Sequence, residues 1–246
     1  TREDMFKFIL SDLQTAEDAF KGGYTPENKS FPSLAVVYGL KARTYLWLGG
    51  FEQGIYEEVL TGEAAYRKAA EYARLAITTS GATPMTKEQY QDVDTGFNTV
   101  QPSWMWAMIQ SVDTILGNLL SFSAQICPES LWGYGGVVDP GVSKMHYDRM
   151  GDADIRKQII VGPETTYADF AQYTNIPNAD YWDYWGAFNT GIGTYTNFKF
   201  RPGQGERVDY MVANAVSLPI MRIEEMEFIA IEALTHLNRA GEAAQR

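Results

Sequence analysis

Apolar residues recur three and four positions apart in the first part of the chain. Over residues 5–20 this spacing predicts a helix with one apolar face, which ends at Gly22 and Gly23. Residues 34–48 are apolar on nearly every side, so we expect a second helix that neighbours cover all round. Residues 63–77 return to helical spacing, with alanines that let helices approach closely and tyrosines that fill the gaps. These segments predict a scaffold of packed helices.

The order of helix, glycine-containing turn and alanine-rich helix resembles a tetratricopeptide unit with a lengthened connection. A second copy of this order begins at 223–237, and residues 240–246 resemble the start of its partner helix. Because the first residues also fall directly into helical spacing, we interpret the chain as a fragment of a longer protein. An export signal or a lipid anchor would then lie outside these residues.

The middle of the chain differs from its ends in composition and in hydrophobic pattern. Residues 102–112 predict a short strand with Trp104 and Trp106 on one face. Residues 117–205 hold more than half of the chain's 22 glycines, together with prolines and scattered aromatics. This composition is typical of loops with short elements, and so long an irregular stretch is either functional or packed down by its own side chains.

Together the patterns predict a mainly α fold, with tetratricopeptide-like helical pairs and a long irregular insert that contains short strands. We expect one domain over 1–246. In it, 1–80 and 218–246 form the helical scaffold, and 81–217 form a loop-rich insert that faces the ligand.

Charge and cysteine content narrow the class of function. The net charge of −11 argues against nucleic-acid binding, because it repels a phosphate backbone and no basic run offsets it. The single cysteine, Cys127, cannot form an internal disulfide, and we expect it to be a buried small apolar residue. No apolar run approaches the roughly 20 residues that a membrane-spanning helix needs.

Candidate metal and catalytic groups are sparse. His146 and His236 lie far apart in the sequence and do not form a zinc-binding pattern. Asp148, Asp152 and Asp154 lack the residue order of an EF-hand loop, so we expect them to make salt bridges and helix caps. No nucleophile and base pattern stands out. We therefore predict no metal, no cofactor and no enzyme active site.

Two aromatic groups are candidate ligand contacts, one over 181–188 and one within the glycine-rich segment 131–136. Flat rings beside amides and carboxylates suit sugars, whose C–H faces stack on rings while their hydroxyls need planar donors and acceptors. The alternative is that these rings pack against the helices and hold the insert in place, since large aromatic side chains are mostly buried. The candidate glycan contacts are Trp132, Tyr134, Tyr181, Trp182, Tyr184 and Trp185.

Several short segments, in a defined order along the chain, carry a likeness to a known family. They are FKFILSDL at 6–13, LKARTYL at 40–46, YRKAAEYA at 66–73, a stretch with a D-x-R motif at 145–156, and LPIMRIEEM at 218–226. Together they resemble the SusD/RagB family, the surface glycan-binding lipoproteins of Bacteroidetes polysaccharide-uptake systems. The chain departs from the family pattern at Ile155, where proline is usual, and at Glu224, where alanine is usual.

The resemblance implies a tetratricopeptide-like scaffold and the binding of an oligo- or polysaccharide without catalysis. It places the aromatic platform before the D-x-R stretch, which favours Trp132 and Tyr134 over the cluster around Trp182. It also implies a SusC-like TonB-dependent transporter as partner, at the outer-membrane surface, with attachment only through a lipid anchor outside this chain. The alternative function is that of an adaptor that binds a protein or peptide, because helical pairs of this kind form concave binding surfaces.

Overall fold

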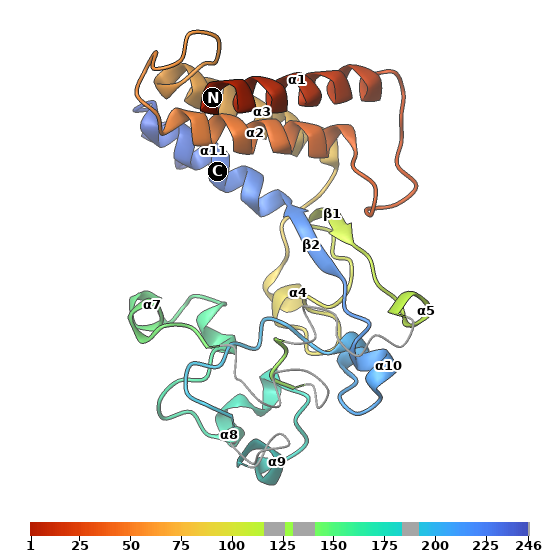
Figure 1. Cartoon of the computed structure of the whole chain (residues 1–246). Helices are drawn as coiled ribbons and strands as arrows, with labels where there is room; N and C mark the ends of the chain where they lie inside the picture. The colour runs from red at the N-terminus through yellow and green to blue at the C-terminus, as the bar shows by residue number, and fades with distance from the viewer. Residues whose placement is uncertain (116–125, 130–140, 184–191, 246) are drawn as a thin grey trace. The chain divides into compact units, whose positions relative to one another are not determined.

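The computed structural model describes residues 1–115, 126–129, 141–183 and 192–245 (Figure 1). The chain divides into two compact units, which we name the helical unit and the insert unit. The helical unit comprises Thr1–Pro84, Pro102–Ala107 and Pro219–Arg246, and the insert unit comprises Met85–Gln101 and Met108–Leu218. The chain therefore leaves the helical unit and returns to it, and each unit has a core of its own.

The long helices of the helical unit lie where the hydrophobic spacing predicts them. They are α1 (Arg2–Lys21), α2 (Leu34–Gly49), α3 (Gly62–Ser80) and α11 (Ile223–His236), and the short α12 (Ala240–Ala243) follows them. α2 packs against α1 and α3, and α11 packs against α3 and α2 (Figure 1). The predicted end of the first helix is confirmed, because the backbone N–H of Gly22 turns back to the Ala19 carbonyl.

Alanines make up the buried face of α3, and their small side chains let this helix approach α2 and α11 closely. Tyr45 of α2 and Tyr72 of α3 fill the space beside them, with ring centroids 5.7 Å apart and planes 2° from parallel. The predicted roles of the alanines and tyrosines are thus confirmed. The buried alanines of this face are Ala65, Ala69, Ala73 and Ala76.

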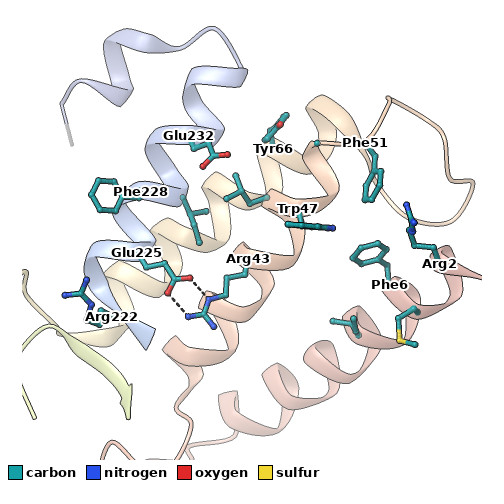
Figure 2. Close-up of a pocket in the computed structure, with 15 residues that line it drawn as sticks. Arg2, Phe6, Arg43, Trp47, Phe51, Tyr66, Arg222, Glu225, Phe228 and Glu232 are labelled. Carbon is teal, nitrogen blue, oxygen red and sulfur yellow. Dashed lines mark hydrogen bonds and ion pairs between the residues drawn. The ribbon is translucent and has the colours of Figure 1, made fainter. Parts of the chain in front are cut away.

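The expectation that neighbours cover α2 on every side is wrong at one position. Trp47 exposes 71% of its surface, although the adjacent Leu48 is completely buried. The reason is that α1 and α11 flank α2 here without closing over it (Figure 2). An apolar run in the sequence therefore contains one residue that the fold leaves open to solvent.

A buried ion pair joins α1 to α2. The ammonium of Lys41 binds the carboxylate of Glu17, and both side chains are almost fully buried. Lys41 also donates to Gln14 Oε1 at 2.8 Å and lies 5.0 Å from the ring centroid of Tyr72. Lys21 donates to the second oxygen of Glu17 at 2.5 Å. These partners offset the large cost of removing the two charges from water.

Two strands lie where the chain passes out of the helices and back to them. β1 (Trp104–Met108) confirms the predicted strand and pairs with β2 (Leu218–Arg222) in a two-stranded sheet. The sequence assigned 218–226 to a helical motif, so β2 was not predicted. The helix begins only at Ile223, whose N–H donates to the Ser103 carbonyl at 2.8 Å.

Short helical turns and loops make up the described part of the insert unit, as its glycine and proline content predicts. Isolated bridges, such as the one between Ile160 and Asn197, replace a regular sheet. The turns are α4 (Lys87–Gln91), α5 (Val112–Ile115), α7 (Lys144–Arg149), η2 (Lys157–Ile159), α8 (Tyr167–Phe170), η3 (Ala171–Tyr173), α9 (Ala179–Asp183), η4 (Gly203–Gly205) and α10 (Tyr210–Ala213).

A fully buried ion pair ties the loops of the insert unit together. Arg201 Nη1 lies 3.2 Å from Oε2 of Glu129, and neither side chain has exposed surface. Oε1 of Glu129 accepts from the Thr174 hydroxyl and from the Asn175 N–H, each at 2.7 Å. Arg201 Nη1 also donates to the Tyr173 carbonyl at 2.7 Å. One carboxylate thus fixes segments that lie far apart in the sequence.

The alanine face predicts a mutational contrast. Ala73→Leu should lower the free energy of unfolding by about 1–3 kcal/mol, because a larger side chain has no room between the packed helices. Arg74→Leu changes the next, exposed residue and should alter it by less than about 0.5 kcal/mol. Urea unfolding followed by far-UV circular dichroism measures both. Equal losses in the two variants would contradict the close packing of α3.

The buried pair of the insert unit predicts a second contrast. Arg201→Met leaves the Glu129 carboxylate buried without its cation, so we expect a loss of about 3–5 kcal/mol in unfolding free energy. The double variant with Glu129→Gln should recover part of this loss. Asp148→Asn breaks the exposed pair with Lys144 and should cost less than about 1 kcal/mol. A loss in this control as large as in Arg201→Met would contradict the argument.

Candidate functional site

The sequence candidates in the insert unit differ in exposure. Tyr181 and Trp182 are neighbours on α9, yet Tyr181 exposes 48% of its surface and Trp182 only 6%. Trp132, Tyr134, Tyr184 and Trp185 lie outside the described residues.

Trp182 belongs to the core of the insert unit. Its ring centroid lies 5.4 Å from that of Phe170 and 6.1 Å from that of Phe198, with the latter ring nearly parallel at 16°. Its backbone carbonyl accepts from the N–H of Ile192 at 3.0 Å, which fixes α9 to the following segment. A ring covered in this way has no face to offer a sugar, so its environment fits the packing alternative.

Tyr181 lies against a guanidinium group. The Arg207 Cζ atom is 5.4 Å from the ring centroid of Tyr181, within cation–π range. Burial lowers the pKa of Arg207, and the nearby carboxylate of Glu129 opposes this shift. A half-exposed phenol ring beside a planar cation is an arrangement on which a sugar ring can stack.

The polar residues that the sequence set aside have structural roles. His236 stacks on Tyr66 with ring centroids 4.3 Å apart, and Cys127 is fully buried. Within the described ranges, no group of three or more His, Cys, Asp or Glu side chains could hold a metal ion. The acidic group forms the ion pairs that were predicted, namely Lys144 with Asp148, Lys157 with Asp152 and Arg156 with Asp154.

The helical unit contains a groove that the sequence did not predict. Its volume is about 1160 Å³, and it runs between α1 and α11 over the exposed side of α2 (Figure 2). Trp47 and Phe228, which exposes 64% of its surface, contribute large accessible rings. The lining residues are Arg2, Met5, Phe6, Ile9, Arg43, Leu46, Trp47, Gly50, Phe51, Tyr66, Arg222, Glu225, Phe228, Ile229 and Glu232.

A fixed ion pair lies in this groove beside Trp47. Arg43 of α2 binds the carboxylate of Glu225 on α11 through Nε and through Nη2, the latter at 2.6 Å. Nη2 also donates to the Ile220 carbonyl of β2 at 2.9 Å. Farther along, the guanidinium carbon of Arg2 lies 5.8 Å from the ring centroid of Phe51. The groove thus combines aromatic faces with planar charged groups whose positions are set by hydrogen bonds (Figure 2).

The groove was not predicted because most of its rings lie within helices whose apolar residues were assigned to the core. One signal could have indicated it. Arg43 and Trp47 lie four positions apart, so they share one side of α2, and Arg43 interrupts the apolar pattern on that side. An arginine and a tryptophan together on one helix face are more typical of a surface than of a core.

Within the described residues, no helix has both the length and the apolar content that crossing a bilayer requires.

No family model and no curated protein matches the sequence.

The fold is similar to that of several solved structures. A SusD-like carbohydrate-binding protein from Bacteroides vulgatus ATCC 8482 matches with a TM-score of 0.61 and 18% identity, over 96% of this chain and 40% of that one. A protein solved with xylogluco-oligosaccharide matches with a TM-score of 0.57 and 18% identity, over 99% and 50%. Surface glycan-binding protein A from Bacteroides thetaiotaomicron, in complex with laminarihexaose, gives a TM-score of 0.51 and 17% identity, over 90% and 49%.

The chain spans half or less of the length of these proteins. At such identities the likeness concerns the fold, and it extends over nearly all of this chain. It agrees with the helices observed here and confirms the predicted mainly α architecture. The chain therefore has a SusD-like fold.

Proposed function

We propose that this chain binds an oligo- or polysaccharide without changing it chemically. The observation that carries the proposal is the SusD-like fold, which the chain shares over nearly its whole length with proteins solved with xylogluco-oligosaccharide and with laminarihexaose. Ring stacking and hydrogen bonding account for such binding without any acid, base or nucleophile.

In this proposal the insert unit contacts the glycan through exposed rings. Among the candidates from the sequence, Tyr181 is the ring that the described residues support, because it is half exposed and lies beside Arg207. Trp182 anchors α9 from the core and so holds Tyr181 in place. The remaining candidates, which belong to the proposal on the strength of the sequence, are Trp132, Tyr134, Tyr184 and Trp185.

The finer part of the proposal concerns location and partner. The ordered family segments and the SusD-like fold support a place at the outer-membrane surface, where the chain would deliver glycan to a SusC-like TonB-dependent transporter. Attachment would come from a lipid anchor outside this chain. Co-purification from solubilised outer membranes tests the partner. Recovery of the chain without any TonB-dependent transporter would contradict this part.

The binding proposal predicts a loss of affinity in Tyr181→Ala. We expect that a glycan found in a calorimetric panel binds this variant about 5 to 30 times more weakly, which corresponds to about 1–2 kcal/mol of lost apolar burial. Tyr24→Ala removes an exposed tyrosine of the helical unit that packs on Phe20, and it should leave the affinity unchanged.

Two results would contradict the proposal. Absence of binding across a broad glycan panel would overturn glycan binding itself. Release of new reducing ends from a bound polysaccharide would show catalysis instead. Unchanged affinity in Tyr181→Ala, with binding intact, would remove only Tyr181 from the site.

A further inference from the structure

The groove of the helical unit offers an accessible indole with fixed polar groups beside it. Trp47 exposes 71% of its surface, and the rings of Phe6, Phe51 and Phe228 lie along the same groove (Figure 2). An exposed indole face is the side-chain surface on which the C–H face of a pyranose ring stacks. The aromatic requirement for a sugar is therefore met by helices, outside the insert unit.

The polar requirement is met by Arg43 and Glu225. Their hydrogen bonds to each other, and from Arg43 to the Ile220 carbonyl, hold the guanidinium and the carboxylate in fixed planes. Sugar hydroxyls both donate and accept, so a paired cation and anion can satisfy them at neighbouring positions. Because the two groups are held before a ligand arrives, little side-chain entropy is lost on binding.

Charge selects among possible ligands. The opposite charges of Arg43 and Glu225 cancel beside Trp47, which favours a neutral sugar over an anionic one. Elsewhere along the groove, Arg222 lies 3.8 Å from the carboxylate of Glu224, and Arg2 and Glu232 carry opposite charges, so the charges of the groove nearly balance. An apolar helix docked there would cover these charges, at a high desolvation cost, whereas a hydroxyl-rich ligand keeps them hydrogen-bonded.

The volume of the groove agrees with an oligosaccharide as ligand. The open groove has a volume of about 1160 Å³, above the range of about 300–1,000 Å³ that is usual for small-molecule sites. It is therefore large enough for several sugar units in a row along α2. From these observations we propose that the Trp47 groove is a second carbohydrate-binding site, which takes a neutral oligosaccharide. This inference rests on the proposed glycan-binding function and adds a separate place for it.

The test uses neutral oligosaccharides of about six units, including β-glucan and xyloglucan fragments, titrated calorimetrically and by tryptophan emission. We expect a binding sugar to shift the emission of Trp47, seen as the difference between the wild type and Trp47→Phe. Trp47→Ala should weaken this binding event at least about tenfold. Phe8→Ala, an exposed aromatic of α1 outside the groove, is the matched control and should change nothing.

The outcomes separate the two proposals. If a sugar binds Trp47→Ala with the affinity and stoichiometry of the wild type, the groove is not a sugar site, while glycan binding at the insert unit stands. If no sugar binds the wild type, glycan binding itself fails. If an amphipathic helical peptide shifts the Trp47 emission and no sugar does, the groove is a peptide site and the inference is overturned. Far-UV circular dichroism of each variant confirms that it is folded.

Discussion

The contact of Arg43 with Glu225 and Ile220 is the constraint on which much of this structure depends. α2 lies before the insert unit in the sequence, whereas β2 and α11 lie after it, so the helical unit is complete only when these segments meet. The guanidinium reaches both, through two bonds to the carboxylate of α11 and one to a carbonyl of β2. The β1 and β2 pair adds a second link at the same junction. The free-energy cost of closing a loop grows only slowly with its length, and the packing of α11 on α3 and α2 offsets this cost together with these links.

The helices of the helical unit could be predicted from sequence because their pattern is local. α1, α3 and α11 each carry apolar residues at helical spacing, and spacing depends only on neighbours along the chain. β2 could not be predicted in this way, since a five-residue apolar run becomes a strand or a helical turn according to what it pairs with. Its partner β1 lies about a hundred residues earlier, beyond the reach of any local pattern.

Exposure of the aromatics was the least predictable property, and two tryptophans show why. Trp47 lies in an almost continuous apolar run and was expected to be covered, yet it is open. Trp182 lies in a glycine-rich, polar region and was a ligand candidate, yet it is packed against Phe170 and Phe198. Both side chains have the same chemistry. The difference arises from which other elements reach them, and this is decided by tertiary packing, which the one-dimensional pattern does not contain.

Buried charge explains how the insert unit keeps a defined shape with little regular structure. A chain of short turns has few backbone ladders to fix its course, so side chains must do so. Glu129 gathers Arg201, Thr174 and Asn175 around one carboxylate, and loss of the Arg201 cation would leave this buried charge without its counter-ion. Beside Trp47 the pair of Arg43 and Glu225 is only partly buried, and its two groups hold each other in place through hydrogen bonds. In the helical unit this pair joins α2 to α11 beside the exposed Trp47 ring, so the ring is presented on helices whose positions are fixed, and ring stacking requires such a fixed geometry.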